Sequence, residues 1–144
     1  MQNYQIKHLI TSICDRFASP TCMGKFEYTD QLIAAIVVAL EDIKGEDIKV
    51  LDLRNIQNAV CKYFIVCSGS SNTQVNALAR SVQKKVSKSL REKPFQVEGT
   101  ESAEWVLLDY IEIVVHIFQK PIREYYDIES LWGDAKLIEI ASNY

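Results

Sequence analysis

The stretch that decides the fold is residues 63–72, which read YFIVCSGSSN. Its first five residues are apolar and partly β-branched or aromatic, which is typical of a central strand buried on both faces. The small polar residues 68–72 then form a turn, and apolar residues at helical spacing follow as far as Leu90, before Pro94. A strand that turns directly into a long helix predicts a mixed α/β layer. Because such a helix makes a crossover connection, we expect the strands on either side of it to be parallel neighbours.

Four further stretches have the composition of strands, and helices flank them. These strands are expected at residues 48–53, 95–98, 105–110 and 112–118. The last two are joined by too few residues for anything but a tight turn, so they predict a hairpin. Thr29 is the expected N-cap of a helix that stops at Lys44-Gly45, and Pro121 can open a closing helix that runs through Tyr126. The predicted fold is a mixed sheet of about five strands flanked by helices.

The chain length and the net charge limit the number of domains and the kinds of function that this sequence can have. With 144 residues, 48% of them hydrophobic, the chain can bury one core, and a second globular domain is not expected. We divide it into an amino-terminal helical extension, residues 1–26, and a domain of residues 27–144. A net charge of -3 and a pI near 5.4 argue against a protein that coats nucleic acid by bulk charge. The sequence shows neither a signal peptide nor a membrane-spanning window, so we expect a cytoplasmic protein with no membrane partner.

The four cysteines and two histidines do not follow a metal-ligand pattern. Cys14, Cys22, Cys61 and Cys67 lie neither in Cys-x-x-Cys pairs nor beside histidines at zinc-ligand spacing. We therefore expect reduced thiols, no bound metal and no cofactor.

Candidate catalytic groups are equally sparse. The Ser68-Gly69-Ser70 turn could hold a phosphate at the start of a helix, but turns of this composition are usually structural. A nucleotidyltransferase would also need paired carboxylates to hold magnesium, and the sequence lacks that pair. His116 lies in an apolar strand, where we expect a buried imidazole hydrogen-bonded to the backbone or to a tyrosine. These observations predict a protein that is not an enzyme.

Two groups of residues remain as candidates for binding. Trp105, Leu107 and Asp109 share one face of their strand, and this combination has the composition of an interface hot spot. The alternative for Trp105 is a place in the core. The second group is a basic stripe on the long helix, formed by Arg80, Lys84, Lys88 and Arg91. This stripe is either a solvated helix face or a contact for the phosphate backbone of RNA.

The carboxyl-terminal half carries a run of sparse signature residues. The run comprises Glu98-Gly99, residues 102–105, Asp109, residues 114–118, Arg123, Tyr125-Tyr126, Glu129 and residues 131–135. Together with residues 44–48, 51–53 and 63–71, this spacing closely resembles the ribosomal silencing factors, also called the Iojap-like family. The resemblance covers about residues 28–138. Residues 1–22 have no counterpart in the family pattern: either translation starts at Met23 or the arm is specific to this lineage.

The resemblance implies a translation repressor without enzymatic activity. Such a factor binds the large ribosomal subunit through ribosomal protein number fourteen and blocks the small subunit when nutrients run short. The family fold is like that of nucleotidyltransferases but lacks their catalytic carboxylates.

Carried over by motif, the candidate residues for the ribosomal contact are Trp105, Leu107, Asp109, Tyr125, Leu131 and Trp132. The last three could equally anchor the terminal helix to the sheet. The alternative functions are a degenerate nucleotidyltransferase-like enzyme and a homodimeric scaffold that uses the same strand surface. A homodimer of the free protein would also be compatible with ribosome binding.

Overall fold

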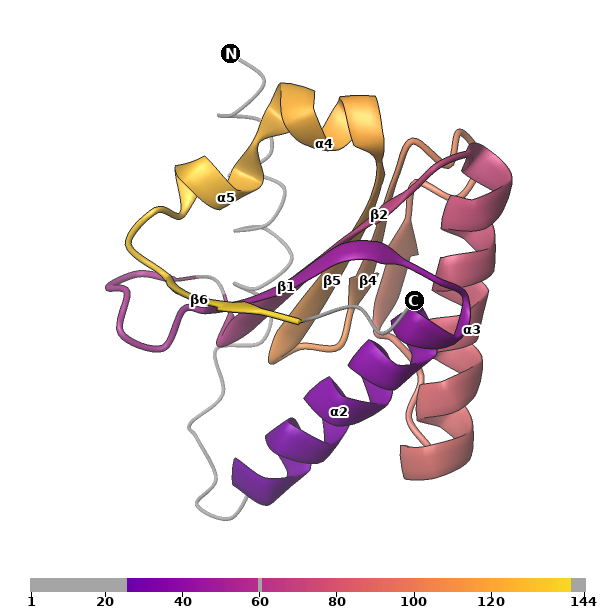
Figure 1. The fold of residues 1–144 in the computed structure, drawn as a ribbon. Coiled ribbons are helices and arrows are strands. Elements are labelled where there is room, and N and C mark those ends of the chain that lie inside the picture. The colour runs from indigo at the N-terminus through magenta and orange to yellow at the C-terminus, as the bar shows by residue number, and fades with distance from the viewer. Residues whose placement is uncertain (1–25, 60, 141–144) are drawn as a thin grey trace.

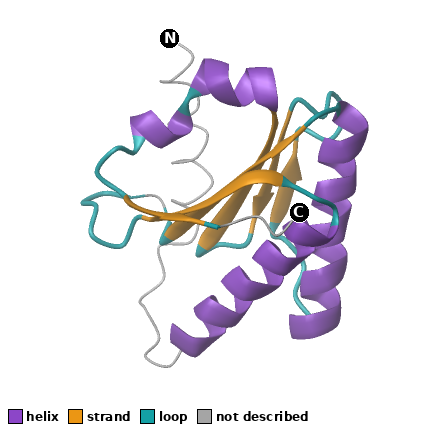
Figure 2. Cartoon of the chain, viewed as in Figure 1, coloured by secondary structure: helices purple, strands orange, loops and turns teal. Residues whose placement is uncertain are grey.

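A six-stranded mixed sheet forms the centre of the computed structural model, which describes residues 26–59 and 61–140 (Figure 1). In chain order the elements are α2 (Phe26–Asp42), β1 (Glu46–Asp52), β2 (Tyr63–Gly69), α3 (Asn72–Leu90), β3 (Gln96–Glu98), β4 (Trp105–Asp109), β5 (Ile113–Gln119), α4 (Lys120–Tyr126), α5 (Ile128–Leu131) and β6 (Lys136–Glu139). The strand order is β3-β4-β5-β2-β1-β6. Helices α2 and α3 cover one face of the sheet, and α4 and α5 lie over the other (Figure 2). The predicted α/β architecture is confirmed, with six strands in place of about five.

Strand β2 is the centre of the sheet, as predicted, and all seven of its residues are buried. Its parallel neighbour is β5, in a register that runs from Tyr63 opposite Ile113 to Gly69 opposite Gln119. The prediction that β2 and β3 are neighbours is wrong, because β4 and β5 lie between them. Six of the seven residues of β5 are buried, which suits a central position, whereas all three residues of β3 are only half-buried, which suits an edge.

The sixth strand, β6, was absent from the sequence prediction. It pairs antiparallel with β1, with Ile138 opposite Val50, and all four of its residues are exposed. A strand without a buried side gives no alternating hydrophobic pattern, so the periodicity on which the prediction relied is missing here.

Helix α2 begins at Phe26, so the prediction that Thr29 is its N-cap is wrong. The Thr29 hydroxyl instead donates a hydrogen bond to Glu112 Oε2 at 2.6 Å, tying the helix to the β4–β5 turn. The predicted stop is confirmed: Lys44 adopts a φ of 59°, and the Gly45 amide donates to the Leu40 carbonyl at 2.8 Å. The predicted extension, residues 1–26, lies outside the described residues except for Phe26.

The sheet separates two hydrophobic cores. The first lies under α2 and α3, and the second lies under α4 and α5. Along β5, Val115 and Ile117 belong to the first core, while Val114 and Phe118 belong to the second, which confirms the predicted alternation. Within the described part of the chain, no helix has both the length and the apolar character needed to cross a bilayer.

The predicted hairpin of β4 and β5 is confirmed, and its turn contains a strained residue. The Glu112 amide donates to the Tyr110 carbonyl at 2.9 Å, which closes a γ-turn around Ile111. Ile111 has a φ of 75°, a conformation that a β-branched residue rarely adopts. Its side chain is 41% exposed, so little packing compensates for the strain.

We expect Ile111→Gly to be more stable than Ile111→Ala by about 1 kcal/mol. Both variants lose the apolar atoms beyond Cβ, and glycine, which loses Cβ too, adopts positive φ without a steric cost. Urea unfolding of the two variants measures the difference. Equal midpoints and slopes would show that the turn stores no such strain.

Candidate functional site

A continuous cluster of aromatic rings lies on the α4–α5 side of the sheet. Trp105 of β4 stacks on Phe118 of β5, with ring centroids 4.9 Å apart and an interplanar angle of 21°. Tyr126 of α4 contacts the Trp105 ring at 5.2 Å, and Tyr125 packs edge-on against Tyr126 at the same distance. The cluster therefore continues from the sheet to the outer surface of α4.

A second branch of the cluster reaches α5. Phe64 of β2 packs edge-on against His116 at 4.7 Å and against Trp132 at 5.7 Å. Because His116 also contacts Trp105 at 5.7 Å, the two tryptophans belong to one connected set of rings. We call the surface formed by Trp105, Tyr125, Tyr126, Leu131 and Trp132 the aromatic face.

The members of the aromatic face differ in exposure. Tyr125 is 67% exposed, the highest value among the exposed large hydrophobic residues of the described chain. Trp105, Tyr126, Leu131 and Trp132 are half-buried. The face thus combines one ring that projects into solvent with four side chains that are partly held by packing.

Leu107 and Asp109, the other two candidates on β4, lie below the surface. Leu107 is 3% exposed and packs in the second core, while Asp109 has no exposed surface. Asp109 Oδ1 accepts a hydrogen bond from the Ile111 amide at 2.7 Å, so this carboxylate belongs to the hairpin turn. Of the three residues predicted together on this strand face, only Trp105 has surface with which to touch a partner directly.

His116 orients Trp105 from beneath. The indole Nε1 donates a hydrogen bond to His116 Nδ1 at 3.1 Å, so the neutral imidazole carries its proton on Nε2. Complete burial lowers the pKa of His116 to about 3, which keeps the ring neutral near pH 7. The predicted buried imidazole is confirmed, but its expected backbone or tyrosine partner is wrong: the partner is Trp105.

A buried arginine holds the α4–α5 segment to the sheet. The side chain of Arg123 in α4 is only 7% exposed. Its Nη1 donates to the Asp47 carbonyl and to Ser68 Oγ, both at 2.7 Å, and its Nε donates to Glu129 Oε1 at 2.7 Å. One guanidinium therefore joins α4 and α5 to the start of β1 and the end of β2.

The carboxylate of Glu129 completes this network. Burial by itself would raise the pKa of Glu129, but hydrogen bonds and charge from Arg123 and then Lys49 outweigh it and lower the pKa. Lys49 Nζ lies 3.2 Å from Glu129 Oε2, on the side of the carboxylate that Arg123 leaves open. The acid is thus ionised and held by two cations on different elements.

The turn before α3 is occupied by its own side chains. Ser71 Oγ accepts from the Gln74 amide at 3.1 Å, and the Ser70 amide and hydroxyl donate to Gln74 Oε1 at 2.7 and 2.8 Å. Ser68 Oγ accepts from Arg123. The structural interpretation of this turn accounts for each of these hydroxyls.

Few side chains of the described chain are suited to act as a nucleophile or to bind a metal ion. Burial raises the pKa of the Cys67 thiol to about 12, which suppresses the thiolate. No group of three His, Cys, Asp or Glu residues among residues 26–59 and 61–140 could hold a metal ion. Cys14 and Cys22 lie outside the described residues.

The basic stripe is on the opposite side of the molecule from the aromatic face. Arg80, Lys84 and Lys88 are exposed on α3, and Arg91 follows as its C-cap with a φ of 56°. The structure therefore does not bring the two predicted groups of binding residues together. RNA contact by the stripe stays a prediction.

Sequence reasoning missed two residues that matter for the aromatic face. Tyr126 links Tyr125 to Trp105, and Arg123 holds the segment that carries both tyrosines. Both belong to the signature run, but a single sequence does not reveal that Arg123 is buried. A buried arginine becomes recognisable only when Ser68 and Asp47, more than 50 positions away, are seen beside it.

Comparison with known proteins gives consistent matches. The family model described as "Ribosomal silencing factor during starvation" matches residues 27–143. Ribosomal silencing factor RsfS of Chromobacterium violaceum is 48% identical over 103 residues, covering 69% of this chain and 80% of that protein. The protein of the same name in Bacillus subtilis is 38% identical over 110 residues, covering 76% and 91%. A crystal structure of a Chromobacterium violaceum protein superposes with a TM-score of 0.68 at 42% identity, covering 79% of this chain and 94% of that one.

Replacing Arg123 by methionine should lower the free energy of unfolding by about 3 kcal/mol, because it leaves the partly buried Glu129 carboxylate with one cation fewer and the buried Ser68 without its donor. Lys85→Met is the control, since Lys85 also lies beside a carboxylate, that of Asp42 at 3.9 Å, but the two side chains are 41% and 58% exposed. The control should cost about 1 kcal/mol or less. Denaturant unfolding measures both, and similar losses would contradict the anchoring role.

The buried imidazole should make stability depend on pH. Its pKa is about 3 in the folded protein and about 6.5 when unfolded, so the unfolded chain binds the extra proton between these values. This stabilisation is complete above pH 6.5 and falls by about 1.4 kcal/mol per pH unit below it. His116→Gln has no buried imidazole to titrate. The difference in the free energy of unfolding between the wild type and this variant should therefore shrink as the pH falls from 7 to 4.5. Parallel curves for the two proteins would rule out a buried neutral histidine.

Proposed function

The chain belongs to the ribosomal silencing factor family, and on that premise we propose that it binds the large ribosomal subunit and prevents the small subunit from joining. Membership makes the chain a ribosome-associated regulator of translation. What we propose beyond family membership is which subunit the protein binds, which residues make the contact and how binding prevents subunit joining. The words "during starvation" in the family description support the further proposal that repression operates when nutrients are limiting.

The observation that carries the proposal is the exposed Tyr125, which Tyr126 links to the half-buried Trp105. Rings of this kind are enriched at the centres of protein interfaces, because they bury a large area with few rotatable bonds. Tyr125 is 67% exposed, although it packs edge-on against Tyr126, which in turn contacts Trp105. A projecting ring on a packed base is the arrangement expected of a docking contact.

The rigidity of Trp105 and of helix α4 supports the same proposal. Trp105 is fixed by its hydrogen bond to His116 and by stacking on Phe118, and α4 is fixed by Arg123. Side chains that are already ordered lose little conformational entropy on binding. In this proposal Leu107 and Asp109 act indirectly: Leu107 belongs to the core against which Trp105 packs, and Asp109 holds the turn at the end of its strand.

We propose ribosomal protein number fourteen of the large subunit as the partner of the aromatic face. On the joining face of the large subunit, a bound protein of 16.5 kDa would occupy volume that the small subunit needs. The mechanism is therefore steric and requires no catalysis. It also places the protein where ribosomes work, in the cytoplasm.

The proposed homodimer of the free protein has a separate candidate surface. Leu137 and Ile138 of the edge strand β6 are 46% and 43% exposed, and exposed apolar residues on a sheet edge favour pairing with another strand. Because β6 is not part of the aromatic face, such a dimer does not exclude ribosome binding.

Subunit joining on a sucrose gradient tests the proposal directly. Purified protein is incubated with isolated large subunits, small subunits are added, and joined ribosomes are separated from free subunits. The proposal expects fewer joined ribosomes and co-migration of the protein with the large subunit. Normal joining with the protein at the top of the gradient would refute it and favour the degenerate-enzyme or scaffold alternatives.

Tyr125→Ala should weaken binding to large subunits at least about tenfold, which corresponds to about 1.4 kcal/mol for a hot-spot residue. Phe95→Ala is the matched control, because Phe95 is 53% exposed and lies in a pocket with Arg91 and Ile111, away from the aromatic face. Co-sedimentation with large subunits measures both variants. Equal binding by the two would remove Tyr125 from the contact.

A further inference from the structure

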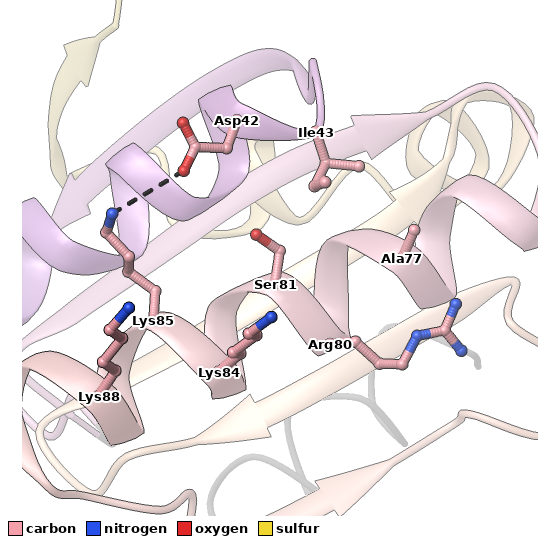
Figure 3. Close-up of a pocket in the computed structure, with 8 residues that line it drawn as sticks. All are labelled: Asp42, Ile43, Ala77, Arg80, Ser81, Lys84, Lys85 and Lys88. Carbon is pink, nitrogen blue, oxygen red and sulfur yellow. Dashed lines mark ion pairs between the residues drawn. The ribbon is translucent and has the colours of Figure 1, made fainter.

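A groove lies on the helical side of the molecule, where the end of α2 meets the outer side of α3. It encloses about 610 Å³. Its lining residues, drawn in Figure 3, are Asp42, Ile43, Ala77, Arg80, Ser81, Lys84, Lys85 and Lys88. The family assignment and the aromatic face do not account for this groove.

The floor of the groove is apolar. Ile43 and Ala77 are half-buried there, and Figure 3 shows Ile43 from the turn after α2 and Ala77 from α3. Ser81 donates its hydroxyl to the Ala39 carbonyl at 2.8 Å, so its polar group already serves the packing of α2 on α3. An occupant would therefore meet mainly carbon at the bottom of the groove.

The rim of the groove is cationic. Arg80, Lys84 and Lys88 are exposed at intervals of four residues, about 6 Å apart along the helix axis. The one carboxylate in the lining, Asp42, lies 3.9 Å from Lys85. Four cations and one carboxylate leave a local charge of +3, in a chain whose net charge is -3.

We propose that this groove binds an acidic amphipathic helix of a partner protein. Apolar side chains of such a helix would enter the groove at Ile43 and Ala77, and acidic residues on either side would meet Arg80, Lys84 and Lys88. RNA would use the cations but leave the apolar floor unfilled. The chain's own residues 1–25 carry a net positive charge, which does not complement a cationic rim. In that stretch Lys7, Arg16 and Lys25 outnumber the single acid Asp15.

The position of the groove makes the two proposed surfaces independent. The groove lies over α2 and α3, whereas the aromatic face lies over α4 and α5 on the other side of the sheet (Figure 1). A partner helix could thus be held by a molecule whose aromatic face is already occupied. A result that refutes one proposal therefore does not refute the other.

The test uses the full-length protein and a fluorescein-labelled helical peptide of about 18 residues. Leucines in the peptide are spaced at i, i+3, i+4 and i+7, and glutamates flank them. A peptide of the same composition in scrambled order controls for bulk charge, and a single-stranded RNA of about 12 nucleotides represents the alternative ligand. Fluorescence anisotropy at low salt measures binding of each probe.

Two groove variants and one control variant locate the site. Lys84→Glu with Lys88→Glu should weaken binding of the patterned peptide at least about tenfold, because rim charges then repel the glutamates. Ala77→Gln should weaken it severalfold by placing an amide over the apolar floor. Lys93→Glu with Lys136→Glu makes the same change of charge outside the groove, and this control should bind as the wild type does.

Several outcomes would overturn the proposal. Absence of peptide binding, or equal binding of the patterned and scrambled peptides, would exclude a helix-specific groove. Tighter binding of RNA that Ala77→Gln leaves unchanged would assign the cations to a phosphate backbone. Self-association of the wild type that the Lys84→Glu, Lys88→Glu variant abolishes in analytical ultracentrifugation would make a second copy the occupant.

Discussion

The guanidinium of Arg123 is the interaction on which one half of the structure depends. Helices α4 and α5 comprise seven and four residues, too few to be stable by themselves. Arg123 binds the Asp47 carbonyl, Ser68 and Glu129 at once, and so holds both short helices against the sheet. The second core, including Phe64 and Phe118, is covered only when that segment is in place.

This anchor also determines the form of the aromatic face. Trp105 belongs to the sheet, whereas Tyr125 and Tyr126 belong to the segment that Arg123 holds. The rings meet at 5.2 Å because a buried polar network fixes the distance between the two layers. A surface for recognising a partner is thus built on buried hydrogen bonds and not on the exposed rings alone.

The elements that could be predicted from sequence are those with a local signal. β2 is apolar throughout, Ser71 and the serines before it open α3, and Lys44-Gly45 ends α2. The exposed β6 and the insertion of β4 and β5 between β2 and β3 carry no local signal, since they depend on pairing across the sheet. For the same reason the sequence pointed to Trp105 but not to the burial of Leu107 and Asp109 beside it.

The pairing of β2 with β5 has a consequence for synthesis of the chain. The register joins Tyr63 to Ile113, so the two innermost strands are separated by α3, β3 and β4 in the sequence. Contacts over such a separation form slowly, because a long loop must close before any contact is gained. While the chain is being made, β2 must wait for β5 to leave the exit tunnel. A protein that regulates ribosomes therefore acquires its central sheet only when most of its own translation is complete.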